Sequence, residues 1–259
     1  MTDDPFRHNA LMEALHREAP IRRNFEILFR DLTVAGYPFL DLYEECMVRS
    51  GTQVGDWKVF RRALRALHLA KYYEYALGLD GARAECGVLM GFSALMLARI
   101  QELRDPASDG AGLHLVDSFE GLSRPGEADA VAMQEVAPGR REPVYSHQRG
   151  HFAVPLEAVR RVMAPYPGVA LHKGWIPEVL ETLPDRHWSF VHIDVDLYEP
   201  TLGCLDYFMP RLAPGGCIVN DDFASPLFPG GGRAWTDYFG SRNLSYVVLD
   251  SGQSVYINA

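Results

Sequence analysis

The chain has 259 residues, with 47% hydrophobic and 23% charged side chains, which is the composition of a globular protein with one large domain. Twenty-five basic and 34 acidic residues give a net charge of −9, and this negative field argues against nucleic acid or an anionic membrane as a partner. No apolar run approaches the roughly eighteen residues that a membrane span needs.

The N-terminus and the cysteines indicate the cellular compartment. The first residues include acids and lack the basic region and apolar core of a secretory signal, so we expect none. Cys46, Cys86, Cys204 and Cys217 form no CxxC or CxxH pair and lie in apolar surroundings. Thiols in such surroundings usually pack as small core residues, so we expect a reduced, cytoplasmic protein with structural cysteines.

Residues 1–80 are predicted to be a helical N-terminal extension or lid. In segments 11–19 and 57–77 the apolar residues recur three and four positions apart, which is the period of an amphipathic helix. Between them, segment 33–41 contains Gly-Tyr-Pro and is predicted to be irregular. Tyr72, Tyr73 and Tyr75 lie at helical spacing and are expected to pack rather than bind a ligand.

From residue 82 onward, short apolar runs alternate with helical segments. The predicted strands are 82–88, 113–119, 169–175, 190–196 and 215–221. This alternation is typical of βαβ units and a parallel sheet covered on both faces. Two further runs flank Ser251, Gly252 and Gln253 and predict an antiparallel hairpin. Residues 81–259 are therefore expected to form a doubly wound, Rossmann-like α/β domain with a mixed sheet.

The segment from Gly121 to Arg149 is long for a connection inside a packed domain and is rich in proline, glycine and charge. It would leave the carboxyl end of the second strand, where ligands bind in such sheets. We therefore favour a mobile active-site cover, and a solvated loop is the alternative.

A glycine-containing turn follows the first predicted strand. Glu85, Gly87 and Gly91 lie where that strand passes into a helix, so the backbone can approach a ligand and the helix N-terminus favours a negative group. The GxxxG spacing matches neither the dinucleotide fingerprint nor a phosphate-binding P-loop. Packing alone would also explain these glycines.

The second strand ends at Asp117, an acid that can accept hydrogen bonds from both hydroxyls of a ribose. Ser118 and Phe119 follow, the first polar and the second able to stack on a base. Together with the glycine turn they suggest a nucleoside ligand, and the alternative is an aspartate that caps its own loop.

Four aspartates and an amide lie at the ends of the fourth and fifth predicted strands. Asp194 and Asp196 lie at the end of the fourth strand, and Asn220, Asp221 and Asp222 lie at the end of the fifth. Because parallel strands end at the same edge of a sheet, these like charges converge there and call for a compensating cation. Oxygen ligands at this density suit Mg²⁺ or Ca²⁺, whereas helix capping would explain only one or two of the acids. His192 is equally compatible with a core and a catalytic role.

Four motifs in this order resemble the macrocin O-methyltransferase (TylF/MycF-type) family: VDSFEGL, KGWIPEVLETLP, HIDVDLYEPTL and PRLAPGGCIVNDDF. The resemblance covers residues 82–259. It implies a class I methyltransferase that uses S-adenosylmethionine and Mg²⁺ to methylate a hydroxyl, typically on a sugar of a natural product. It also implies a small-molecule acceptor and a homo-oligomer, with neither nucleic acid nor membrane as partner.

The resemblance assigns the site residues. Glu85, Gly87 and Gly91 would surround the methionine moiety, Asp117 and Ser118 would meet the ribose, Phe119 or Trp175 would line the adenine, and Thr52 belongs to the segment that would cover the cofactor. Asp194, Asp221 and Asp222 would hold Mg²⁺, with Asp194 and Asp196 in the catalytic centre and Asp196 as general base. Cys86 and Asn220 depart from the family pattern, and Arg233 occupies a basic position to which we assign no role.

The implied mechanism needs little from the protein beyond alignment and proton removal. Mg²⁺ would lower the pKa of the acceptor hydroxyl and Asp196 would take the proton. A catechol- or phenol-type O-methyltransferase is one alternative, and a non-catalytic nucleoside-binding scaffold is another.

Overall fold

The computed structural model describes residues 27–52 and 59–259, so the helix predicted at 11–19 lies outside the described residues. The segment predicted to be irregular forms a two-residue ribbon, β1 (Thr33–Val34) with β2 (Tyr37–Pro38), followed directly by a helix, α3 (Phe39–Ser50). The interpretation of this segment missed α3, because the proline lies just before the helix and does not interrupt it. The helix predicted at 57–77 is confirmed as α4 (Val59–Ala76).

The sheet of this fold has seven strands, in the order β10-β11-β9-β8-β3-β4-β7. Its strands are β3 (Ala82–Cys86), β4 (Leu113–Asp117), β7 (Ala170–Lys173), β8 (Trp188–Ile193), β9 (Leu212–Asn220), β10 (Val247–Val248) and β11 (Ser254–Ile257). The first five are parallel, and β11 and β10 add an antiparallel hairpin at the β9 edge. The Rossmann-like mixed sheet is therefore confirmed.

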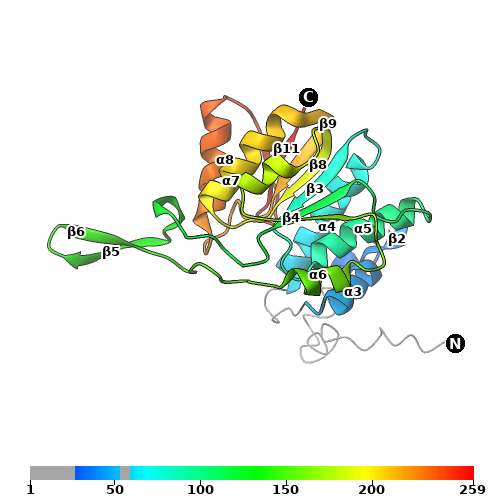
Figure 1. The fold of residues 1–259 in the computed structure, drawn as a ribbon, viewed down its shortest axis with the longest axis horizontal. Coiled ribbons are helices and arrows are strands. Elements are labelled where there is room, and N and C mark those ends of the chain that lie inside the picture. The colour runs from blue at the N-terminus through cyan, green and yellow to red at the C-terminus, as the bar shows by residue number, and fades with distance from the viewer. Residues whose placement is uncertain (1–26, 53–58) are drawn as a thin grey trace.

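Helices cover both faces of this sheet (Figure 1). The remaining helical elements are α5 (Phe92–Arg104), α6 (Leu156–Val162), η4 (Glu178–Thr182), α7 (Tyr198–Phe208), η5 (Met209–Arg211) and α8 (Pro229–Ser241). One hydrophobic core packs α3, α4 and α5 against the sheet, and a second packs η4, α7 and α8 against its other face. The described helices of segment 1–80 thus share a core with the sheet, and the division at residue 80 stays a prediction.

The chain reverses its direction of travel across the sheet at β3. From β3 it moves outward to β4 and β7, then returns to β8 on the other side of β3 and continues to β9. Open α/β sheets bind ligands at the carboxyl ends of the strands that flank such a switch point. The fold therefore places a ligand site beyond Cys86 and Ile193, which are partners in the ladder between β3 and β8.

The long segment 121–149 contains more regular structure than its composition suggested. It forms η3 (Glu127–Asp129) and an antiparallel ribbon of β5 (Ala132–Ala137) and β6 (Arg140–Val144). All six residues of β5 are exposed, and the ribbon projects away from the sheet (Figure 1). The η3 part of the segment lies beside the carboxyl edge, since Asp129 Oδ1 accepts from the backbone N–H of Tyr198 at 2.7 Å. A role as an active-site cover stays a prediction.

All four cysteines are buried and form no disulfide, as the sequence predicted. Burial raises the pKa of the Cys217 thiol to about 12, which keeps it protonated. Among the described residues, no helix combines the length and the apolar character needed to cross a bilayer.

Candidate active site

The predicted acids converge because β8 and β9 are parallel neighbours that end together. Ile193 pairs with Asn220 in the ladder, and the backbone N–H of Asp221 donates to the carbonyl of Ile193 at 2.9 Å. Asp194, Asp221 and Asp222 follow these ends, and each offers one carboxylate oxygen within 4.8 Å of the others. The three acids predicted to bind a metal therefore form one cluster.

Asp196 lies beside this cluster in an unusual backbone conformation. Its φ is 63°, in the left-handed region that side chains other than glycine seldom occupy. Its backbone N–H donates to Asp222 Oδ2 at 3.0 Å, and its carbonyl accepts from Gly231 at 3.2 Å. The strained loop is thus held between Asp222 and the start of α8, as is typical of functional sites.

Burial and mutual repulsion disfavour the ionised form of most carboxyl groups in this cluster. Burial and the neighbouring Asp221 raise the pKa of Asp194 to about 7. Burial and the other aspartates also raise the pKa values of Asp196 and Asp222 well above their usual range. A divalent cation would relieve this repulsion, and a set of carboxylate oxygens is the ligand chemistry that Mg²⁺ prefers.

Asp221 differs from the other acids because cations and donors surround it. Burial opposes its ionisation, but His192 and Arg65 lower the pKa of its carboxyl below the usual range. Arg65 of α4 donates to Oδ2, and Gln253 donates to Oδ1 at 2.8 Å. Asp221 is therefore ionised and fixed in position before any ligand arrives.

Gln253 begins a hydrogen-bonded chain that the sequence did not reveal. The Ser251 hydroxyl donates to Gln253 Oε1 at 2.7 Å, and His68 Nδ1 lies 3.0 Å from the same hydroxyl. Ser251 and Gln253 were predicted only as a turn between β10 and β11. Arg65 and His68 reach Ser251 across more than 180 residues of sequence. No local sequence motif indicates such contacts between separate elements.

His192 and Glu85 form a buried pair between β8 and β3. His192 Nδ1 lies 2.9 Å from Glu85 Oε1, and its Nε2 lies 3.8 Å from Asp221 Oδ1. Burial opposes protonation, but the two carboxylates outweigh it and raise the pKa of His192 to about 10. The histidine is thus a buried cation that balances acids on both sides, which neither sequence-based alternative for it had described.

The remaining oxygen of Glu85 fits a polar ligand. Oε2 is buried and has no hydrogen-bond partner within the described part of the chain. A buried carboxylate oxygen without a partner is costly, so a donor from a bound molecule would satisfy it. This observation agrees with the predicted place of Glu85 beside the methionine moiety of the cofactor.

The glycine turn brings the ends of β3 and β8 into close contact. A Cβ on Gly87 would lie 1.9 Å from the carbonyl oxygen of Asp194, so only glycine fits there. Gly91, with φ of 82°, precedes the first residue of α5. A Cβ on Gly51, at the end of α3, would lie 3.9 Å from the Met90 side chain, and this places Thr52, the next residue, near the turn. Residues 53–58 of the predicted cofactor-covering segment lie outside the described residues.

Asp117 joins the glycine turn to the end of β4. Its Oδ2 accepts from the backbone N–H of Val88 at 2.7 Å, and its Oδ1 accepts from that of Phe119 at 2.6 Å. The Asp117 carboxylate thus orders the turn from a half-buried position where it can also meet a ligand. Both readings of this aspartate, loop capping and ribose binding, are compatible with its contacts.

The other residues predicted to contact the cofactor, Ser118, Phe119 and Trp175, already have partners within the protein. Ser118 donates to the carbonyl of Gly121 at 2.8 Å, so its hydroxyl already has a partner within the turn. Phe119 is buried and packs in the hydrophobic core. Trp175 is half-buried just beyond β7, with the Arg149 guanidinium 5.8 Å from its ring centre. Of the two aromatic residues predicted beside adenine, Trp175 is the more accessible.

Arg233 lies on α8 and has a structural contact. Its Nη1 donates to the carbonyls of Ala128 and Ala130, at 2.5 and 3.2 Å. It therefore holds the η3 segment against α8, next to Gly231 and the acidic loop. Asn220 Oδ1 accepts from the backbone N–H of Asp222 at 3.3 Å and so helps to shape the turn that carries Asp221 and Asp222.

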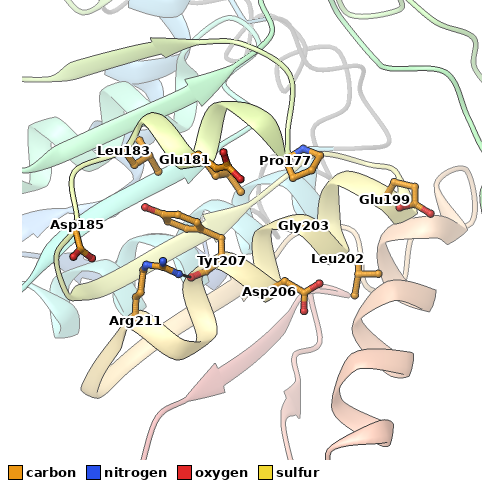
Figure 2. Close-up of a pocket in the computed structure, with 11 residues that line it drawn as sticks. Pro177, Glu181, Leu183, Asp185, Glu199, Leu202, Gly203, Asp206, Tyr207 and Arg211 are labelled. Atoms are coloured by element: carbon orange, nitrogen blue, oxygen red, sulfur yellow. Dashed lines mark hydrogen bonds between the residues drawn. The ribbon is translucent and has the colours of Figure 1, made fainter.

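A hollow of about 600 Å³ lies elsewhere, between η4 and α7 (Figure 2). Its walls carry Glu181, Asp185, Asp206 and Arg211, and none of the predicted site residues lines it. We therefore place the candidate active site at the carboxyl edge of the sheet, where the acids and the glycine turn meet.

These features together define a class of protein: a Rossmann-like methyltransferase fold with an acidic cluster at its carboxyl edge. The solved structure of the O-methyltransferase NovP is similar, with a TM-score of 0.61, 21% identity, and coverage of 76% of this chain and 80% of that one. An S-adenosylhomocysteine-bound methyltransferase of Podospora anserina has a TM-score of 0.52 at 14% identity, covering 93% and 95%. At these identities the likeness shows the fold alone.

Sequence comparison gives the family. Residues 53–251 match the family described as macrocin-O-methyltransferase (TylF), and the chain belongs to it. A relative from Streptomyces olivaceus, the 8-demethyl-8-(2,3-dimethoxy-alpha-L-rhamnosyl)-tetracenomycin-C 4'-O-methyltransferase, is 34% identical over 179 residues. That match spans 65% of this chain and 65% of the relative, slightly less than two thirds of its length.

Proposed function

We propose that this chain is an O-methyltransferase that uses S-adenosylmethionine and Mg²⁺ to methylate a sugar hydroxyl of a glycosylated natural product. The observation that carries the proposal is the cluster of Asp194, Asp221 and Asp222, with ligand oxygens within 4.8 Å of one another beside the glycine turn. Family membership and the solved structures with the same fold support the cofactor. The rhamnosyl acceptor named for the Streptomyces olivaceus relative supports a sugar as the substrate class.

The residues divide the chemical work. S-adenosylmethionine supplies an electrophilic methyl group when bound. Asp194, Asp221 and Asp222 would hold Mg²⁺, whose charge lowers the pKa of an adjacent hydroxyl. Asp196 is placed beside these ligands, with its backbone N–H bonded to Asp222 Oδ2, to accept the proton of the acceptor.

The chain also has to exclude water and hold the acceptor oxygen in line with the methyl group. Glu85 and Asp117 bind the cofactor in this proposal, and the hydrogen bonds from Arg65 and Gln253 keep Asp221 in one orientation. We further propose a cytoplasmic protein that associates with copies of itself and has neither nucleic acid nor membrane as a partner.

A calorimetric titration tests the cofactor first. S-adenosylhomocysteine is titrated into the purified protein with Mg²⁺ present, and NADH serves as the control ligand. We expect micromolar binding of S-adenosylhomocysteine and none of NADH. Absence of S-adenosylhomocysteine binding by the folded protein would contradict the methyltransferase proposal.

The metal role is tested with Asp194→Asn. Because Asp194 belongs to the metal cluster and not to the ribose contact, this variant is expected to bind S-adenosylhomocysteine normally. Methyl transfer to an acceptor is expected to fall at least about a hundredfold, through loss of the metal charge. Full transfer by the variant, or by the wild-type protein in EDTA, would show that the metal has no role.

A further inference from the structure

Aromatic side chains from two distant segments meet beside the acidic cluster. The His147 ring stacks on Phe228 with centroids 4.3 Å apart, and it lies 5.1 Å from the ring of Phe152. Phe152 and Phe228 are 6.0 Å apart, and His151 contacts both His147 and Phe152. We call His147, His151, Phe152 and Phe228 the aromatic platform.

The aromatic platform lies outside both hydrophobic cores, with His151 and Phe152 exposed and His147 and Phe228 half-buried. Phe152 is 46% exposed, and the adjoining Leu227 is 50% exposed. Phe152 also has a φ of 64°, a conformation that is strained for a bulky side chain. Neither phenylalanine belongs to the two cores of the described structure. An apolar cluster that is held in a strained backbone and is not used for folding indicates a binding surface.

Hydrogen bonds tie one side of the platform to the metal acids. Phe228 precedes the first residue of α8, and its backbone N–H donates to the Ser225 hydroxyl at 3.3 Å. The Ser225 N–H in turn donates to the carbonyl of Asp222 at 3.1 Å. In the first turn of α8, Gly231 donates to the carbonyl of Asp196 at 3.2 Å. Phe228 therefore lies within one helical turn of Gly231, the residue that contacts Asp196.

Hydrogen bonds connect the other side of the aromatic platform to the carboxyl end of β4, which carries Asp117. The backbone N–H of Leu122 donates to the carbonyl of His151 at 2.9 Å, and Gly150 donates to the carbonyl of Leu122 at the same distance. Gly121 accepts from Ser118, the residue after Asp117. The two halves are joined where the Ser146 hydroxyl donates to the carbonyl of Leu227. The platform thus connects the carboxyl end of β4 with that of β9.

The chemistry of the platform fits a flat, uncharged ligand. Its rings offer π-faces and apolar edges, to which aromatic bodies bind by offset or edge-to-face stacking. Partial burial and the neighbouring His151 lower the pKa of His147, so its ring is neutral near pH 7. Arg149, the nearest arginine in sequence, already stacks on Trp175. A nucleoside diphosphate would instead require a cluster of cations or backbone donors.

We infer that the aromatic platform binds the aglycone of the acceptor, a flat and uncharged aromatic body, while the attached sugar lies at the acidic cluster. This inference rests on the proposed function, since it assigns a binding surface to the aglycone to which the methylated sugar is attached. It makes Phe152 and Phe228 specificity-determining residues, whereas the aspartates act on the sugar alone.

The test compares two glycosides that share a sugar and differ in aglycone. The probes are 4-methylumbelliferyl α-L-rhamnopyranoside and methyl α-L-rhamnopyranoside, with S-adenosylhomocysteine and Mg²⁺ present. Saturation-transfer NMR reads which probe protons touch the protein, and titration gives the dissociation constants. We expect the aryl glycoside to bind about tenfold more tightly, with the strongest saturation on its ring protons.

Phe152→Ala is the main variant, because its side chain is exposed and its loss should not disturb the fold. Phe228→Leu is the second variant. Each is expected to lower the affinity for the aryl glycoside about tenfold and to leave that for the methyl glycoside unchanged. Tyr75→Ala, which removes an exposed aromatic ring far along α4, is the matched control and should change neither. Unchanged S-adenosylhomocysteine binding confirms that each variant is folded.

Three results would overturn the inference: equal binding of the two glycosides by the wild-type protein, equal loss of both in Phe152→Ala, or tighter binding of a nucleotide-linked rhamnose than of the aryl glycoside. Failure of the proposed function has a different signature. In that case S-adenosylhomocysteine does not bind, or neither sugar is methylated when S-adenosylmethionine is supplied, whatever the aglycone.

Discussion

At the scale of single residues, Gly87 shows how tightly the ends of β3 and β8 pack at the candidate active site. The carbonyl of Asp194 occupies the space that a side chain would need, since a Cβ on Gly87 would approach its oxygen to 1.9 Å. The same glycine has φ of 89°. Two requirements, a left-handed backbone and close contact with the loop that carries Asp194, therefore meet at one position.

Gly87→Ala is expected to destabilise the protein by about 3 kcal/mol or more, because β3 and β8 must separate to admit the methyl group. Gly139→Ala is the matched control: its φ is 74°, and a Cβ there meets nothing within 4 Å. We expect it to cost only about 1 kcal/mol, from backbone strain alone. Chemical denaturation of both variants measures the difference. Equal losses would show that the contact with Asp194 does not matter.

A histidine pair in the sheet makes stability depend on pH. His114 Nδ1 lies 3.0 Å from His172 Nε2, and the rings stack. Burial, followed by the charge of His172, lowers the pKa of His114 from 6.5 to about 4. As the pH falls below 6.5 the unfolded chain gains a proton there and the folded chain does not, so stability is lost between pH 6.5 and 4.

This loss should be at most about 3.5 kcal/mol, because each unit of pKa difference corresponds to about 1.4 kcal/mol. Urea denaturation between pH 4 and 7.5 measures it. His114→Gln is expected to flatten that part of the curve, whereas His187→Gln, at an exposed position, should leave it unchanged. A His114→Gln curve with the same slope as the wild-type curve between pH 6.5 and 4 would contradict the assignment, since the raised pKa values of the active-site aspartates affect both proteins equally.

Sequence reasoning predicted that the acids converge and missed the residues that hold them in place. The acids were predicted because a strand end followed by aspartates is a local pattern, and parallel strands bring such patterns to one edge. Arg65, Gln253 and His68 are remote from the acids in sequence and lie in ordinary helical or turn contexts. Their contacts follow from how α4 and the β10–β11 turn pack, which no local pattern encodes.

At the scale of elements, α4 both covers the sheet and supplies polar groups to its edge. Its apolar face packs in the first core, while Arg61, Arg65 and His68 reach residues 221–251. The sequence predicted this helix from its periodicity. It did not predict which polar residues of the helix would face the acids, because that depends on the rotation of the helix against the sheet.

The β5–β6 ribbon should contribute little to stability. Two strands alone are marginal in water, and every residue of β5 is exposed. Replacing residues 133–143 with an Asn-Gly turn is expected to change the melting temperature by no more than about 2 °C. Differential scanning calorimetry measures this, with light scattering at the same concentration. A fall of about 8 °C, or a change in molecular mass, would show that the ribbon packs against another copy of the chain.

The ribbon also shows where composition misleads. Proline, glycine and charge in segment 121–149 favoured a loop, yet Pro138 and Gly139 form the tight turn between two strands. The ladder between β5 and β6 satisfies the backbone groups without a hydrophobic face. Patterns based on alternating polarity cannot detect such strands, because neither face is buried.

At the scale of the whole molecule, the buried acids set a balance between stability and function. Four aspartates near one another repel, and this repulsion opposes folding when no cation is bound. Mg²⁺ should therefore stabilise the protein, since it binds the folded cluster and not the unfolded chain.

Asp222→Asn is expected to remove this dependence. The amide oxygen keeps the hydrogen bond that Asp222 accepts from the backbone of Asp196, while one buried charge is lost. We expect the variant to melt at a higher temperature than the wild-type protein in EDTA, and to show no rise on addition of 5 mM or so of Mg²⁺. Ca²⁺ and Mn²⁺ titrations extend the comparison. A variant with the wild-type response to Mg²⁺ would exclude Asp222 as a ligand.

The sequence by itself determined the class of fold, the succession of strands along the chain and the convergence of the acids. These follow from periodicity and from the geometry of parallel sheets, which act over short stretches of chain. Only the tertiary structure decided which groups balance the charge of Asp221, how His192 is used, and where the aromatic platform lies. Those outcomes depend on contacts between elements far apart in the chain, and such contacts form only when the whole core is packed.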